Sequence, residues 1–147
     1  MSKAAYWVTS VLLLIGAGTT ASADVITDWN EKATALVMKH RTLPPQAERI
    51  IACMHVAMFD AVNSVDRRYQ SYGSPIAAPK DASKEAAAAA AAGGVLLQLF
   101  PADAKDLQVA LSDYLKPMPD GPAKIVGIKI GEDVAANTIM DRKGDGA

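Results

Sequence analysis

The sequence has little of what most metal and redox sites are built from. Among 147 residues there is one cysteine, Cys53, and there are two histidines, His40 and His55. One cysteine excludes an intramolecular disulfide framework and a cysteine-rich zinc site. The neighbours of Cys53 along the chain are apolar, so we expect a buried and unreactive thiol. The chain also lacks a Walker loop and the H-E-x-x-H, C-x-x-C and G-x-S-x-G motifs, so its own motifs predict no bound cofactor or metal.

An excess of charge of either sign is also missing. Fifteen lysines and arginines oppose sixteen aspartates and glutamates, which gives a formal net charge of −1. Proteins that bind nucleic acid normally carry a strong basic excess, so we expect no nucleic-acid partner. Only 5% of the residues are aromatic, but 50% are hydrophobic, which is too many for a disordered chain. The length allows one domain.

The first 23 residues have the pattern of an export signal peptide and are not expected to join the fold. Lys3 precedes an apolar stretch over residues 4–18, and the segment ends in the cleavage pattern A-S-A at residues 21–23. This pattern predicts an exported protein, periplasmic or secreted, with no stable membrane span after cleavage. The uncharged stretch over residues 4–23 is also long enough for an uncleaved membrane anchor, and this alternative stays open.

Residues 24–147 predict an all-α domain of about five helices that form part of a helical bundle. Apolar residues recur at helical spacing, and no clear period-two pattern of a strand occurs. The first helix is expected to start at Asp28, with Glu31 three residues later as in a capping box, and to end near residues 40–41. Pro44 opens a second helix that runs to about residue 65. Its apolar arc is so wide that we expect this helix to be central to the domain.

The second half of the chain predicts three more helices after a loop over residues 66–80. One begins at residues 83–85 and contains the alanine run 86–92, which has the highest helix propensity available. Pro101 and Pro122 open the fourth and fifth helices. On the fifth, small residues recur every four positions, at Gly127, Gly131 and Ala135. Glycine costs about 1 kcal/mol against alanine in a helix, so we expect this stripe to serve close helix packing.

Three polar residues on the second predicted helix are the candidate site residues: His55, Asp60 and Asn63. An inward-facing His55 is either a general base or ligand-orienting group, or a buried imidazole bonded to a neighbouring element, and we favour the second interpretation. Asp60 and Asn63 are three residues apart, so they can interact, but we favour a role in tying down the following loop. We assign no catalytic, cofactor-binding or metal-binding residue. A metal hydrolase built on His55, Asp60 and Glu132 is the least favoured alternative.

The remaining charged residues predict surface features. His40 ends the first helix and is expected to be exposed, and Glu132 with Asp133 is expected to form a solvated face of the fifth helix. The pair Arg67 and Arg68 is either a phosphate contact or a solvated turn, and the adjacent acid at position 66 favours the turn.

Several segments together resemble a known family. They are DVITDWN at residues 24–30, HVAMFDAVN at 55–63 followed by Arg68-Tyr69, LLQLFP at 96–101, IGE at 130–132 and GDG at 144–146. Together they look like the N-terminal helical region of exported bacterial proteins in the superfamily of vanadium-dependent haloperoxidases and type 2 phosphatidic acid phosphatases. The resemblance covers nearly all of residues 24–147, and its most specific part is the H-x-A-x-x-D-A-x-N block.

The resemblance implies an all-helical fold that binds vanadate or phosphate, and either oxidation of halide with hydrogen peroxide or hydrolysis of phosphate monoesters through a phosphohistidine. The family grips its oxyanion with three motifs: a lysine followed later by Arg-Pro, a Ser-Gly-His, and a Ser-Arg with a histidine beyond it. None of the three motifs occurs in this chain, and His55 matches none of them. The family places these motifs C-terminal to the region that the chain resembles.

We therefore expect the chain to be the front part of such an enzyme and to be inactive alone. Vanadate or phosphate would be bound by the full-length protein, and the expected partner is the missing C-terminal catalytic bundle, supplied in cis or in trans. A homo-oligomer is a further open possibility. In this interpretation the isolated chain leaves apolar surface uncovered. The alternative is a self-sufficient periplasmic helical module that binds a protein partner or an apolar ligand.

Overall fold

The computed structural model describes residues 24–73 and 75–144. The predicted export signal, residues 1–23, lies outside this part of the chain. The described elements are α1 (Val25–Lys39), α2 (Pro44–Asp66), α3 (Lys84–Leu99), the short 3₁₀ helix η1 (Pro101–Asp103), α4 (Ala104–Leu115) and α5 (Pro122–Asp141). The predicted all-α class and the five helices are confirmed, and residues 24–73 and 75–144 contain no strand.

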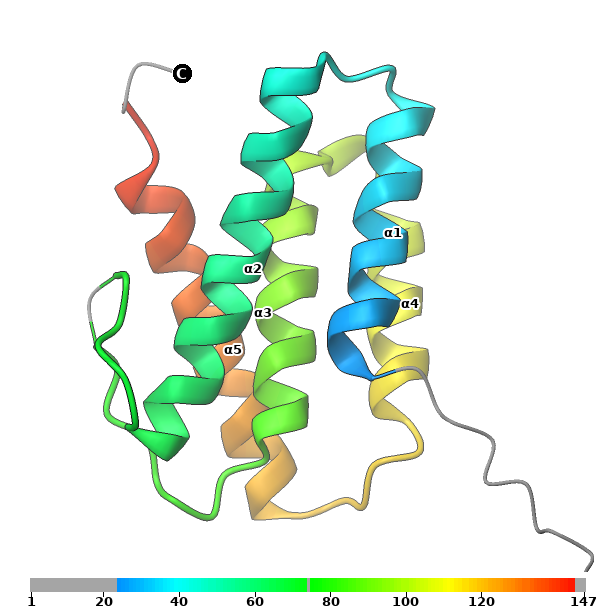
Figure 1. Ribbon diagram of the computed structural model, residues 1–147. Coiled ribbons are helices and arrows are strands. Elements are labelled where there is room, and N and C mark those ends of the chain that lie inside the picture. The colour runs from blue at the N-terminus through cyan, green and yellow to red at the C-terminus, as the bar shows by residue number, and fades with distance from the viewer. Residues whose placement is uncertain (1–23, 74, 145–147) are drawn as a thin grey trace, which may run out of the picture.

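Successive helices run antiparallel, so that α1, α3 and α5 point one way and α2 and α4 the other (Figure 1). Helices α1 and α2 lie side by side in front. Behind them, α3 lies between α5 on one side and α4 on the other (Figure 1). Helix α3 contacts each of the other four helices. The bundle is therefore built around α3.

Helix α2, which the sequence predicts to be central to the domain, packs against three helices, but α3 packs against four and is the more central of the two. Every residue of the alanine run is buried: Ala86, Ala87, Ala88, Ala89, Ala90, Ala91 and Ala92. Alanine projects so little from the helix that four neighbours can approach α3 from all sides. Helix α2 has a wide apolar arc but is still exposed along its outer side, for example at Ala52. The apolar arc of α2 indicates how much of that helix is buried. The small side chains of α3 let more helices pack around it.

The closest helix contact joins α3 and α5, as the stripe of small residues predicts. A Cβ atom added to Gly131 would lie 2.3 Å from the carbonyl oxygen of Ala87, and one added to Gly127 would lie 2.4 Å from that of Ser83. No real Cβ atom tolerates such distances, so only glycine fits at either position. Close to this contact, the amide of Ser83 donates a hydrogen bond of 2.9 Å to the carbonyl of Ala123. The two backbones touch along this seam.

The ends of two helices differ from the sequence prediction. Helix α1 begins at Val25, because the Asp24 side chain accepts hydrogen bonds of 3.0 Å from the amides of Ile26 and Thr27. Asp24 is thus the N-cap, and the expected start at Asp28 is wrong by one helical turn. The fourth helix opens with a separate 3₁₀ turn, η1, before α4 begins. The expected starts at Pro44, Lys84 and Pro122 are confirmed.

Trp29 fixes α1 against the centre of the bundle. Its indole is fully buried, and a Cβ atom on Gly93 of α3 would lie 3.1 Å from the ring, so this glycine leaves space for the indole. The ring of Tyr114 in α4 lies 6.4 Å away, and its hydroxyl donates to Glu85 at 3.1 Å. Burial, reinforced by Glu85, raises the pKa of Tyr114. Among the described residues the Trp29 Nε1 has no hydrogen-bond partner.

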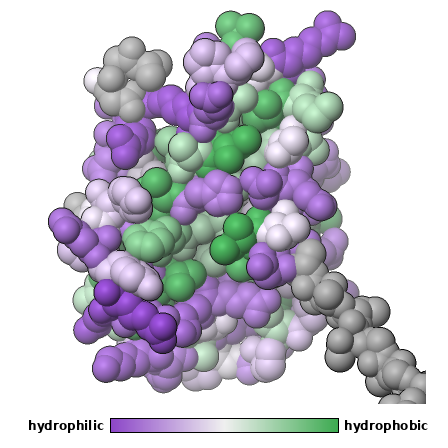
Figure 2. Space-filling model, in the orientation of Figure 1, coloured by the Kyte–Doolittle hydropathy of each residue, from purple (hydrophilic) through white to green (hydrophobic). Residues whose placement is uncertain are grey.

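The face of the molecule shown in Figure 2 mixes polar and apolar patches. The largest exposed aliphatic side chains are distributed over several elements: Ile26, Met38, Leu43, Val109, Ile125 and Met140. None of the described helices is by itself long and apolar enough to cross a membrane. The pair formed by α3 with the segment Pro101–Leu115 passes that test of length and composition only jointly, across a bend of 115°.

Replacing Gly131 tests the α3–α5 seam. We expect Gly131→Val to lower the free energy of unfolding by about 2 kcal/mol or more, because overpacking against a backbone carbonyl forces the helices apart. The matched control is Ala136→Val on the exposed side of α5, which should cost less than about 1 kcal/mol. Urea unfolding followed by circular dichroism measures both. Equal effects of the two variants would show that the seam does not limit stability.

Candidate functional site

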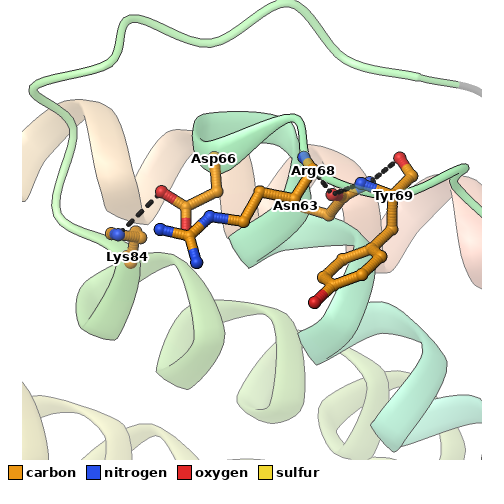
Figure 3. A network of polar contacts seen from close by, with 5 residues as sticks. All are labelled: Asn63, Asp66, Arg68, Tyr69 and Lys84. Carbon is orange, nitrogen blue, oxygen red and sulfur yellow. Dashed lines mark hydrogen bonds and ion pairs between the residues drawn. The ribbon is translucent and has the colours of Figure 1, made fainter.

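The polar residues that the sequence singles out on α2 converge on the loop that follows this helix. The Asn63 side chain accepts hydrogen bonds from the amides of Arg68 at 3.1 Å and Tyr69 at 2.9 Å. Its Nδ2 donates to the carbonyl of Tyr69 at 2.7 Å (Figure 3). The buried amide group therefore behaves as a cap that reverses the chain direction at the end of α2. This is the loop-holding role that the sequence favours for Asn63.

Asp60 holds the same loop one turn earlier in α2. Its Oδ1 accepts from the amide of Tyr72 at 2.9 Å, and its Oδ2 accepts from the amide of Gly73 at 2.8 Å. The side chain is only 5% exposed. Both oxygens of this buried carboxylate thus bind backbone amides, which is the bonding that a buried charge requires. Asp60 has the same role as Asn63 and does not bond to it directly.

The turn that directly follows α2 contains a residue in the left-handed region and several charged side chains. Arg67 ends α2 in the left-handed region, with φ of 53°, and donates to the carbonyl of Ala78 at 2.7 Å. Asp66 accepts from Lys84 at the start of α3 at 2.7 Å and lies 3.6 Å from the Arg68 guanidinium (Figure 3). The hydrogen bond from Lys84 lowers the pKa of Asp66. Arg68 therefore lies in an ion-paired turn, while Arg67 is a structural link that the sequence did not reveal.

Two tyrosines of the loop pack on α2. The rings of Tyr69 and Tyr72 lie 6.0 Å and 5.5 Å from the ring of Phe59. Both tyrosines remain about 70% exposed, at 70% and 72%. The loop is therefore attached to α2 through its backbone and through these ring contacts, while most of the surface of both tyrosines stays exposed.

His55 lies elsewhere on α2, at the interface with α1. Its Nε2 is 3.2 Å from the Oδ1 of Asn30, and the residue is half-buried. A hydrogen bond to a neighbouring helix is the interpretation that the sequence favours, although the imidazole is less buried than expected. The structure does not bring His55 together with Asp60 and Asn63.

A cluster that sequence reasoning missed joins α1 to η1. The Asp103 carboxylate is only 4% exposed and accepts from Lys39 and, at 2.5 Å, from the Nε2 of His40. The His40 ring lies 5.1 Å from the ring of Phe100. The hydrogen bond from Lys39, followed by that from His40, lowers the pKa of Asp103, and the same contact raises the pKa of Lys39. His40 is exposed as expected, but its Nε2 also bonds to the buried carboxylate of Asp103.

The only sequence signals for this cluster were the basic end of the first helix and an acid just after Pro101. Each has a local explanation, because bases suit a helix C-terminus and acids suit a helix N-terminus. Their contact depends on α1 ending beside the start of α4, which no local pattern reveals.

The described side chains form no cluster of metal ligands. In the described part of the chain, no group of three or more histidine, cysteine, aspartate or glutamate residues could hold a metal ion. His55, Asp60 and Glu132 therefore do not form the site that a metal hydrolase would require. Cys53 is buried and free, as expected, and Asp133 of the predicted solvated face pairs with Lys129.

No protein-family model, no curated protein and no solved structure matches the chain.

Replacing Asp60 tests the loop clamp. We expect Asp60→Asn to lower the free energy of unfolding by about 1–3 kcal/mol, because an amide group can accept from only one of the two loop amides. Amide hydrogen exchange should accelerate at Tyr72 and Gly73. The control Asp113→Asn, on the exposed side of α4, should stay within about 0.5 kcal/mol. Unchanged exchange at the two amides would contradict the clamp.

The Lys39–His40–Asp103 cluster predicts a pH dependence. The pKa of Asp103 is below its usual 3.8 in the folded state, so this carboxylate stabilises the fold above that pH. The stabilisation is lost as the pH falls through the lowered pKa. We expect the free energy of unfolding of Asp103→Asn to be below that of the wild type near neutral pH, and the difference to shrink as the pH falls below 3.8. Other carboxylates titrate in both proteins, and their effect cancels in the difference between the two free energies of unfolding. A difference that does not change with pH would therefore contradict the assignment.

Proposed function

We propose that the chain is the helical scaffold portion of an exported protein related to vanadium-dependent haloperoxidases and type 2 phosphatidic acid phosphatases. In this proposal the chain supplies packing surface, and a catalytic helical bundle supplied in cis or in trans binds vanadate or phosphate. The complete protein oxidises halide with hydrogen peroxide or hydrolyses phosphate monoesters. The H-x-A-x-x-D-A-x-N block over residues 55–63 is the main sequence support.

The observation that carries the proposal is how that block is used. All described side-chain hydrogen bonds of Asp60 and Asn63 join the loop: the two side chains accept four from loop amides, and Asn63 donates one to the Tyr69 carbonyl and a longer one, 3.5 Å, to the Ser71 hydroxyl. A carboxylate and an amide committed in this way shape the chain and do not grip a ligand. The structural use of both residues supports a scaffold role for the segment that carries the resemblance.

Export is part of the same proposal and is supported by the pattern over residues 1–23. Reading the gene beyond codon 147 tests the whole proposal. A continuing frame, or an adjacent one, that encodes Arg-Pro and Ser-Gly-His segments is the expected result. A stop codon with no such neighbour would favour the second candidate below.

Anion binding by the purified chain provides the biochemical test. We expect orthovanadate and phosphate to leave the melting temperature unchanged, because the chain has none of the three oxyanion motifs. A ligand at 100 times its dissociation constant stabilises a protein by about 2.7 kcal/mol, which a melting curve detects easily. Saturable stabilisation by either anion, or bromination of a dye by rigorously pure chain, would contradict the proposal.

The second candidate is a self-sufficient helical module, and the complete burial of the α3 alanine run favours it. Residues Ala86 to Ala92 are no more than 1% exposed within these five helices alone. A self-sufficient module should unfold in one cooperative transition, with circular dichroism and Trp29 fluorescence changing together. A scaffold that lacks its partner should instead bind hydrophobic dyes and lose Trp29 packing before helicity.

A further inference from the structure

A polar cavity of about 220 Å³ lies between the loop that follows α2 and the C-terminal end of α5. Its lining residues come from α2, from the loop and from the end of α5: Val56, Tyr72, Gly73, Thr138, Asp141 and Arg142. In Figure 1 the loop and α5 lie on the same side of α2. The hydrogen bonds that Asp60 accepts from the amides of Tyr72 and Gly73 hold the loop at the edge of this space.

Two carboxylates flank the same point beside Gly73. A Cβ atom on Gly73 would lie 3.4 Å from the Asp141 Oδ2 and 3.5 Å from the Asp60 Oδ2. Both are ordinary contact distances, so a group of about the size of a methyl or an ammonium group fits between the two oxygens. The Asp60 Oδ2 already accepts from the Gly73 amide, whereas Asp141 has no hydrogen bond or ion pair with any residue that the structure describes.

Thr138 adds an unused hydroxyl group to this cavity. The residue is only 7% exposed, and its hydroxyl has no hydrogen-bond partner among the described residues. Within the same ranges, the one enclosed side-chain atom that lacks a partner is the Trp29 Nε1, so the Thr138 oxygen must reach open space. The open space that Thr138 lines is this cavity. Buried hydroxyl groups normally have a partner, and this one can find it only there.

The charges around the cavity favour a positive ligand. The one described base that lines it is Arg142, which forms no ion pair with Asp60 or Asp141. Along the chain, the neighbours of the cavity outside the described ranges are Ser74 and residues 145–147, which add one acid and no base. The buried carboxylate of Asp60 is balanced by backbone amides and by no cation of residues 24–73 and 75–144. A positive group beside Asp141 would therefore be attracted by two negative charges.

We propose that this cavity binds a small primary ammonium ion, of the class of short alkylamines. The ammonium group lies beside Gly73 and donates to the Asp141 carboxylate and the Thr138 hydroxyl, while the alkyl group contacts Val56. Asp60 keeps its role in the loop and contributes its negative charge at short range. The volume is below the roughly 300–1,000 Å³ of typical small-molecule sites, which limits the ligand to a few carbon atoms. This inference requires no catalytic activity and is independent of the family resemblance.

Titration calorimetry of the purified chain with methylammonium, in an amine-free buffer of constant ionic strength, tests the proposal. We expect saturable binding, with the nuclear magnetic resonance signals of the Gly73 and Thr138 amides shifting at the same dissociation constant. Acetate should not bind, and neither should tetramethylammonium, which has the charge but no N–H group to donate. Absence of saturable methylammonium binding, or equally tight binding of either control ion, would overturn the proposal. Displacement of methylammonium by calcium would show a metal site and would overturn it as well.

Gly73→Ala places a methyl group at the proposed position of the ammonium group. The φ angle of Gly73 is not positive and the added Cβ makes only ordinary contacts, so the melting temperature should not fall. Methylammonium binding should weaken by about tenfold or more, because the methyl group separates the ion from the Asp141 carboxylate. Unchanged affinity in a folded Gly73→Ala chain would overturn the proposed position of the ligand.

Three variants of α5 separate the site from the overall charge. Asp141→Asn should weaken methylammonium binding by about 10-fold to 100-fold, the range of hydrogen bonds to charged groups. Glu132→Gln removes the same charge from the opposite, exposed side of α5 and should leave binding unchanged. Thr138→Val removes only the unpartnered hydroxyl, so it should weaken binding by about twofold to tenfold without lowering the melting temperature. Equal effects of the two charge variants, or a less stable Thr138→Val chain, would overturn the site assignment.

Discussion

The alanine surface of α3 and the glycines of α5 set the spacing on which the bundle depends. Two helices approach so closely at Gly127 and Gly131 that added Cβ atoms would overlap the backbone of α3. An almost smooth central helix has little apolar area of its own, so its neighbours must provide the bulky side chains. They do so with Trp29 from α1 and Met54 from α2, both fully buried. The core is thus built by large residues that pack onto a small-residue helix.

The polar interactions of the fold are used at its ends and turns. Asp60 and Asn63 close the loop after α2, and Asp103 joins the end of α1 to η1. Each of these side chains is at least nine-tenths buried and has hydrogen-bond partners. Buried polar groups with complete bonding specify chain direction and leave little capacity for a substrate. These side chains therefore serve the fold, in agreement with the scaffold role proposed for this segment.

The cavity between α2, the end of α3 and the end of α5 lies apart from these polar contacts. Its volume is about 250 Å³, and its described walls include Ile50, Leu99 and Ile139. Helix packing is therefore tightest along the α3–α5 seam and leaves more space where α5 ends.

The sequence by itself determined the helices and most of their ends, because local signals act there. Pro44 and Pro122 open helices, Ser83 caps one, and the four-residue repeat of small residues on α5 marks a close contact. The same reasoning placed Asp60 and Asn63 at the loop, since a helix-terminal acceptor finds the nearest free amides. It failed at Asp28, because Asp24 had free amides one turn earlier.

Only the tertiary structure decided which helix is central and which distant residues meet. The burial of α3 depends on four neighbours, and no pattern within the alanine run reveals them. The contact of His40 with Asp103 spans 63 positions, and the cavity lined by Ile50, Leu99 and Ile139 needs residues from three helices. Local sequence encodes hydrogen bonds and periodicity within a few turns of helix. Helix order in space results from how side-chain volumes fit together across the whole chain.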